Sequence, residues 1–180
     1  MNYQKQDHKC FLNDAKFSQN GGCGYVLKPE FLRSPNPNYS PIEIPNNISL
    51  GPKLMSLTII SGQHIPRKSS GGFAGPYVKA RIIGHSDEQD TKHVTESVKK
   101  NGFNPFWNET FQFYIKAPAL AFLELTVRDK QNYTIKLREK VAKDPTLGGY
   151  ICPINLLRQG RQSYTLKMNY FYSILTLISV

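Results

Sequence analysis

The sequence predicts a mainly β protein, an antiparallel sandwich. Short apolar runs rich in branched side chains recur between turn residues along much of the chain, and no helical period of comparable strength competes with them. One run alternates cleanly, because Phe111, Phe113 and Ile115 fall on one face and Gln112 on the other. With 180 residues there is room for one ordinary domain and an appendage, so a complete large enzyme is not expected.

The expected strands follow one another between turn residues such as Gly62, Gly84 and Pro118. They span residues 55–60, 77–83, 110–115, 122–127, 149–151 and 174–180. Residues 154–159 are long enough for one helical turn only. The last apolar stretch, 170–180, is well short of the roughly 20 residues that span a bilayer, so it is predicted to be a closing strand.

Residues 34–53 predict a linker. This segment contains Pro35, Pro37, Pro41, Pro45 and Pro52 among asparagines and a glycine, a density of turn formers that neither a helix nor a central strand tolerates. The linker would separate an amino-terminal piece, 1–33, from a longer block, 54–180.

The formal net charge of +10 favours an anionic partner. Acidic lipid, phosphorylated headgroups and nucleic acid all fit that charge, but no aromatic stacking platform or reader motif accompanies the basic residues, so nucleic acid is not expected as a partner. Cys10, Cys23 and Cys152 are too few and too scattered for a disulfide framework. Together with an amino terminus unlike a secretory signal, they predict a cytoplasmic protein with reduced thiols.

Two motifs point to a family. Residues 20–29 read Asn-Gly-Gly-Cys-Gly-Tyr-Val-Leu-Lys-Pro, and Phe31, Leu32 and Arg33 follow. This pattern resembles the end of the second catalytic half, the Y-box, of eukaryotic phosphoinositide-specific phospholipase C. Residues 1–4 resemble the last strand of that family's TIM barrel, and residues 11–17 resemble the segment that follows it.

The second motif runs Gly-Pro-Tyr-Val-Lys at 75–79 and Lys-Asn-Gly-Phe-Asn-Pro-Phe-Trp-Asn-Glu-Thr-Phe at 100–111. It resembles a C2 domain, the calcium-binding and lipid-binding sandwich that follows the barrel in those phospholipases. The resemblance implies an eight-stranded antiparallel C2-type sandwich at 54–180, preceded by a barrel remnant at 1–33. It also implies that Trp107 packs inside and that Asn104 and Pro105 form a turn.

The resemblance implies a membrane-associated signalling enzyme that cleaves phosphatidylinositol 4,5-bisphosphate. The family's catalytic histidines and calcium-binding carboxylates lie in the first half of the barrel, and none of His8, His64, His85 and His93 falls on a catalytic position. We therefore expect no catalytic residue in this chain and no hydrolysis by it alone. A free-standing lipid-binding or protein-binding module without catalysis remains the alternative.

The loops of the sandwich predict weak calcium binding at best. Calcium takes roughly six to eight oxygen ligands, mostly from carboxylates. Where calcium-binding C2 domains have aspartates, the resemblance places Gly75, Ser69 and Gln131, so that Asp129 and Asp144 remain as a residual site. Calcium is therefore expected in the intact family enzyme, with little or none bound tightly by this chain.

The same loops predict peripheral association with an anionic phospholipid surface. Between residues 128 and 143, six basic residues face two acidic ones. The candidate lipid-binding residues are Arg67, Lys68, Lys99, Lys100, Lys130, Lys136, Arg138, Lys140 and Lys143. A solvated basic rim without a target is the alternative. Phe103, Phe106 and Trp107 could form a membrane wedge, but we expect them to be buried under this rim, since aromatic side chains near a turn usually close the core. We expect Cys23 to be a structural thiol.

Overall fold

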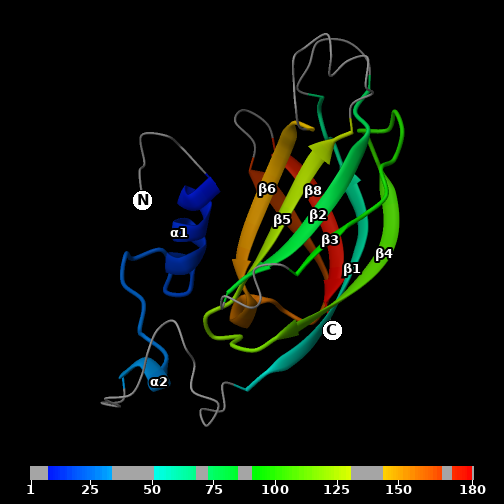
Figure 1. Ribbon diagram of the computed structural model, residues 1–180. Coiled ribbons are helices and arrows are strands. Elements are labelled where there is room, and N and C mark those ends of the chain that lie inside the picture. The colour runs from blue at the N-terminus through cyan, green and yellow to red at the C-terminus, as the bar shows by residue number, and fades with distance from the viewer. Residues whose placement is uncertain are drawn as a thin grey trace.

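The computed structural model describes residues 8–33, 51–67, 73–84, 91–130, 144–167 and 172–179. Eight antiparallel strands form a sandwich of two layers, with a helix beside one of them (Figure 1). The strands are β1 (Lys53–Gln63), β2 (Pro76–Ile83), β3 (Lys92–Val94), β4 (Phe106–Ile115), β5 (Phe122–Asp129), β6 (Thr146–Pro153), β7 (Gly160–Lys167) and β8 (Tyr172–Ser179). The predicted antiparallel eight-stranded sandwich is confirmed.

One layer has the strand order β3-β2-β5-β6 and the other β7-β8-β1-β4. The layers join through the pairing of Gly149 in β6 with Lys167 in β7. All pairings are antiparallel. The predicted closing strand lies between β7 and β1, so it is a central strand of its layer.

Two strands carry little apolar sequence. In β7, residues 160–167 read Gly-Arg-Gln-Ser-Tyr-Thr-Leu-Lys, and they form a strand because every one of them pairs with β8. The three residues of β3 pair with Lys79, Ala80 and Arg81 of β2. Strand β4 begins at Phe106, earlier than predicted, because Phe106 pairs with Ser61.

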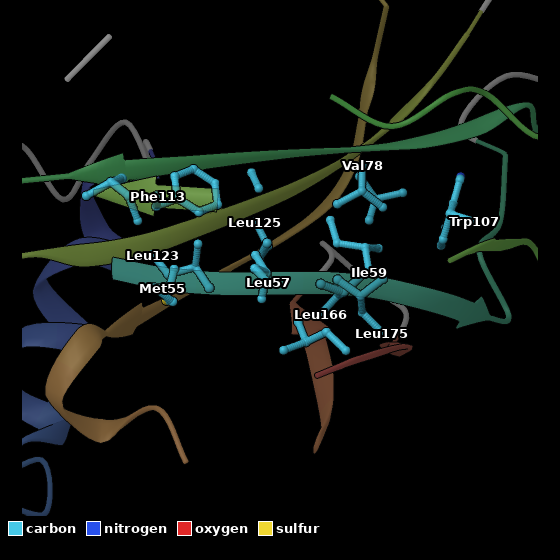
Figure 2. Close-up of a cluster of buried hydrophobic side chains, with 14 of the residues drawn as sticks. Met55, Leu57, Ile59, Val78, Trp107, Phe113, Leu123, Leu125, Leu166 and Leu175 are labelled. Atoms are coloured by element: carbon cyan, nitrogen blue, oxygen red, sulfur yellow. The ribbon is translucent and has the colours of Figure 1, made fainter. Parts of the chain in front are cut away.

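The core lies between the layers, where alternate residues of the strands point inward. In β1, Met55, Leu57 and Ile59 are buried while their neighbours are more exposed. Figure 2 shows these side chains facing Val78 and Leu125 from the other layer. Trp107 lies at the end of this row, 9% exposed, so its predicted burial is confirmed.

The amino-terminal piece forms two short helices, α1 (His8–Ser18) and α2 (Glu30–Arg33). Helix α1 lies against the outer face of β6, where Ala15 packs with Phe122 and Ile151 (Figure 1). A shallow hollow of about 140 Å³ remains between α1 and β6. The segment resembling a barrel end is thereby attached to the sandwich through apolar contacts.

The glycines of the first motif end α1. The N–H of Gly22 donates to the carbonyl of Phe17 at 2.9 Å, which closes the last turn of the helix. Gly22 and Gly24 have φ of 80° and 62°, a region that side chains with a Cβ avoid. The amide of Asn20 also donates to the carbonyl of Tyr25 at 3.0 Å. The motif therefore ends α1 and turns the chain.

Some of the predictions concern residues outside the described ranges. The barrel-strand resemblance of residues 1–4 and all but the end of the linker at 34–53 fall there. So do Lys68, Ser69, His85, Gln131, Lys136, Arg138, Lys140 and Lys143. The domain limits 1–33, 34–53 and 54–180 remain predictions. Within the described part of the chain, neither helix has the length and apolar character needed to cross a bilayer.

Candidate functional site

The candidate site is one end of the sandwich, which we call the apex: residues 64–67, 73–76, 98–105 and 129–130. Strand β1 ends there, β2 and β4 begin there, and β5 ends there (Figure 1). These segments are far apart in sequence, and strand pairing brings their ends together. The described lysines that the sequence predicts as lipid ligands lie on this end.

Backbone hydrogen bonds fix two of the loops against each other. The N–H groups of His64 and Ile65 donate to the carbonyls of Phe103 and Gly102, at 2.8 and 2.7 Å. A Cβ on Gly102 would collide with the carbonyl oxygen of Ile65, so only glycine permits this approach. The predicted turn before Pro105 is also present, because Asn101 Oδ1 accepts from the Asn104 N–H at 3.1 Å.

The loop before β2 is fixed to the end of β5. The N–H of Lys130 donates to the carbonyl of Gly75 at 2.9 Å, and the N–H of Gly75 donates to Oδ1 of Asp129 at 2.7 Å. Asp129 is only 2% exposed. Its other oxygen, Oδ2, lies 3.4 Å from Nε of Arg67. Gly75 and Asp129, which the C2 resemblance assigns to one calcium-binding region, are thus in direct contact.

The two carboxylates of the predicted residual calcium site have different surroundings. Asp129 is buried on the inner side of its layer, whereas Oδ2 of Asp144 accepts a hydrogen bond from the hydroxyl of Tyr77 at 3.1 Å. Tyr77 alternates with the buried Pro76 and Val78, so it points outward. In the described residues no group of three or more His, Cys, Asp and Glu side chains could hold a metal ion. Asp129 and Tyr77, the partner of Asp144, thus lie on opposite faces of this layer.

The predicted basic rim is present where the structure describes it. Lys99, Lys100 and Lys130 are exposed, whereas the side chain of Arg67 is 15% exposed and faces Asp129. Lys100 has a φ of 54°, which turns the chain at the tip of its loop. Three lysines of the rim are available to an anionic partner, while Arg67 is engaged inside the apex.

The prediction that Phe103 and Phe106 are buried is wrong. Phe103 is 68% exposed and Phe106 is 63% exposed, and only Trp107 of the three closes the core. The reason is strand pairing, since Trp107 points inward from β4 and its neighbour Phe106 must point outward. Phe103 lies beyond the strand, where its ring and the ring of His64 are perpendicular, with centroids 4.9 Å apart.

Phe73, which the sequence analysis did not single out, is 73% exposed and belongs to the same surface. It precedes Ala74, whose Cβ would lie 3.2 Å from a Cβ on Gly102, the residue before Phe103. Two exposed phenylalanines therefore flank a contact between neighbouring loops. A large aromatic residue among glycines and alanine, in Gly-Gly-Phe-Ala-Gly at 71–75, is the signal that could have identified it.

A second cationic cluster, also not predicted, lies on the outer face of the layer containing β2. Lys79 has its pKa lowered by burial and by the positive charges of Arg128 and Arg81. Tyr77, next to Arg128 across β2 and β5, has its pKa raised by burial and by the negative charge of Asp144. Strand register, which the sequence does not display, gathers these side chains.

Two histidines, His64 and His93, contact aromatic rings. His93 stacks on the ring of Phe111, with centroids 5.0 Å apart, and meets Phe113 edge to face at 4.9 Å. His64 contacts Phe103, and His8 begins α1.

The thiol of Cys23 receives a hydrogen bond from the amide of Asn20 at 2.9 Å within the glycine turn.

Comparison with known proteins places this geometry in a family. Residues 53–167 match the C2 domain model, and residues 1–31 match the model of the phosphatidylinositol-specific phospholipase C, Y domain. The chain belongs to the C2 domain family. The C2 domain here follows a Y-domain end in the order found in phosphoinositide-specific phospholipase C, so the resemblance stated from the two motifs is confirmed.

Relatives of the C2 domain and its Y-domain segment include three 1-phosphatidylinositol 4,5-bisphosphate phosphodiesterases. They are gamma plc-3 of Caenorhabditis elegans (34% identical over 94% of this chain), human delta-4 (37% over 89%) and human delta-1 (32% over 89%). This chain spans only 12 to 20% of their lengths.

Solved structures show the same fold. The crystal structure of L. pealei PLC21 matches 100% of this chain with a TM-score of 0.78 and 23% identity, over 22% of that protein. A C2 domain of plant Extended Synaptotagmin 1 matches 70% of this chain with a TM-score of 0.56 and 21% identity, over 91% of that domain. The first match includes the amino-terminal helices, whereas the second covers a smaller part of the chain.

Proposed function

We propose that the chain is the carboxy-terminal part of a phosphoinositide phospholipase C, whose intact form cleaves phosphatidylinositol 4,5-bisphosphate into diacylglycerol and inositol trisphosphate. Support comes from the Y-domain and C2 matches in one chain and from relatives that are named as phosphodiesterases of this lipid. The packing of α1 on β6 supports this proposal over a free-standing module, since the barrel-end segment packs against a defined part of the sandwich.

Within that enzyme, the C2 domain makes the peripheral contact with the cytoplasmic membrane surface. The observation that carries this proposal is the apex, where exposed Phe73 and Phe103 lie among exposed Lys99, Lys100 and Lys130. Apolar rings favour the headgroup boundary, and ammonium groups favour anionic lipid. An anionic phospholipid surface satisfies both kinds of side chain at once.

The second proposed partner is the catalytic barrel of the intact enzyme. Tyr25 and Leu27 of the Y-domain segment are 84% and 75% exposed. Large apolar side chains that lie close together on a surface mark a contact site. We assign them to the barrel because they belong to the segment that matches the Y domain.

Calcium has its proposed role in the barrel of the intact enzyme, with no tight site in this chain. The chain by itself is proposed to be non-catalytic, because His64 and His93 contact aromatic rings and none of the four histidines falls on a family catalytic position. Purified chain should release no inositol phosphates from labelled phosphatidylinositol 4,5-bisphosphate vesicles. Calcium-dependent turnover would contradict this assignment.

The experiment that tests the membrane contact compares two triple variants in vesicle co-sedimentation with chelator present. Lys99, Lys100 and Lys130 are changed to Gln in one variant, and Lys53, Arg158 and Arg161 in the other. Both lose three positive charges, but the second set is exposed at the opposite end of the sandwich. At about 1 kcal/mol for each basic side chain, the apex variant should lose on the order of a hundredfold in affinity.

Vesicles of phosphatidylcholine with phosphatidylserine should bind the wild type more strongly than phosphatidylcholine alone, and salt should release it. The control triple variant should retain most of the binding. Equal losses in both variants would mean that net charge, rather than the apex, attracts the membrane. Equal binding to both vesicle types would rule out an electrostatic contact.

A further inference from the structure

The ion pair between Arg67 and Asp129 lies where the C2 resemblance expects calcium. Asp129 ends β5 and is 2% exposed, and the side chain of Arg67 is 15% exposed. The carboxylate has Gly75 N–H on Oδ1 at 2.7 Å and the guanidinium Nε at 3.4 Å from Oδ2. Both oxygens of this buried acid therefore have a positively polarised neighbour.

A buried carboxylate requires such compensation, because removing an unpaired charge from water costs several kcal/mol. In a calcium-binding loop, several carboxylates surround a divalent ion, which supplies the positive charge. Here the described part of the apex places one buried carboxylate beside one guanidinium, so their charges cancel without a metal ion.

We propose that Arg67 is a built-in replacement for calcium at the apex. Its guanidinium is the counterion of Asp129 and joins the loop after β1 to the end of β5 whether or not calcium is present. This assignment takes Arg67 away from the lipid-binding rim. It also goes beyond the proposed membrane contact, because the pair would hold the apex together without any membrane.

Gly75 complements Arg67 in this arrangement. A Cβ at position 75 would lie 3.7 Å from Oδ1 of Asp129 and 3.3 Å from the carbonyl of Lys130. An aspartate at this position would thus bring a second carboxylate next to Asp129. With arginine at 67 and glycine at 75, the single positive charge of the guanidinium balances the single carboxylate of Asp129. A neutral residue at 67 with aspartate at 75 would instead leave two carboxylates, which favour a divalent ion.

The first test is a double-mutant cycle on the 180-residue chain, read as the midpoint of thermal unfolding in chelator. Arg67→Gln and Asp129→Asn should each lower the midpoint, by on the order of 10 °C, because each removes one charge of the pair and leaves the other without this compensation. The double variant, in which neither charge remains, should recover much of the loss. Additive losses, or single variants as stable as the wild type, would overturn the ion pair as a stabilising contact.

The second test asks whether Arg67 takes the place of a calcium ion or makes a structural contact that is unrelated to calcium. Calcium added to the wild type should leave the midpoint unchanged, whereas it should raise the midpoint of the Arg67→Gln, Gly75→Asp variant. The matched control, Arg67→Gln with Gly75→Asn, has the same side-chain size without the new carboxylate and should not respond. A calcium-stabilised wild type, or no response from the aspartate variant, would overturn the replacement. Vesicle binding by the lysine rim is measured separately, so either proposal can fail alone.

Discussion

Arg81 and Glu124 pair across β2 and β5, with Nε and Nη2 of the arginine both 2.7 Å from Oε2 of the glutamate. The glutamate side chain is 11% exposed and the arginine side chain 31%. Lys79 lies on the same face, where burial and the positive charges of Arg128 and Arg81 lower its pKa. Glu124 thus places a negative charge within the cationic cluster of the outer face.

Replacing Glu124 by Gln should destabilise the sandwich. The change leaves a partly buried guanidinium without its counterion among other positive charges, at a cost of about 1–3 kcal/mol after allowance for the exposure of Arg81. Urea unfolding measures this loss. Glu109→Gln is the control, because Glu109 is more exposed and its amide oxygen can still accept from Glu96 N–H. An equal effect in both variants would argue against a role for the pair.

The exposed rings of the apex should add a salt-independent part to membrane binding. Changing Phe73 and Phe103 to Ser removes two side chains that each contribute about 1.5–3 kcal/mol when fully buried, so vesicle affinity should drop at least tenfold. Leu54→Ser with Tyr114→Ser is the matched control, since these exposed residues pair across β1 and β4 at the other end. Binding that survives the loss of both phenylalanines would limit the contact to the lysines.

Gly102→Ala should destabilise the fold by disrupting the contact between the apex loops at 64–67 and 98–105. Its new Cβ would meet the backbone oxygen of Ile65, and overpacking of this kind costs about 1–3 kcal/mol. Gly149→Ala is the comparison, because its Cβ would make an ordinary 3.5 Å contact with the Leu125 carbonyl. Trp107 is the only tryptophan and lies beside this end of the core, so its fluorescence follows unfolding in denaturant. Equal stability of the two variants would show that the loops adapt.

Alkaline pH should destabilise the fold through groups near β6. Burial, followed by the charge and hydrogen bond of Cys152, raises the pKa of Tyr150, and burial raises the pKa of Cys152 and of Tyr164. A raised folded-state pKa means that the unfolded chain releases its protons first. Stability is therefore fully present below the unfolded-state pKa values, about 8.5 for cysteine and 10 for tyrosine, and is lost as the pH rises from there through the folded-state values.

The measurement is the urea midpoint of unfolding as a function of pH. Tyr150→Phe should flatten the alkaline fall, because phenylalanine has no proton to lose. Tyr114→Phe is the control, since Tyr114 is 58% exposed. A wild-type profile that is level through the alkaline range would contradict the role of these buried groups.

The sequence by itself determined the sandwich class and most of the strands. Apolar alternation around Phe111, Phe113 and Ile115, and the branched runs of β1, β2 and β5, encode which faces are buried, because a strand repeats every two residues. Local motifs also indicated the family, since the glycine turn after α1 and the Asn-Pro turn before β4 need particular residues. The C2 resemblance placed the lysines of the apex in the loops of the sandwich.

Only the tertiary structure decided which residues meet. Pairing with β8 made a strand of the polar β7, pairing with Ser61 turned Phe106 outward, and the contact between loops left Phe73 and Phe103 on the surface. The meeting of Arg67, Gly75 and Asp129 depends on the ends of three strands, separated by many residues. The physical reason is that side-chain patterns report which face of a strand is buried, whereas charge compensation depends on long-range register, which no local pattern contains.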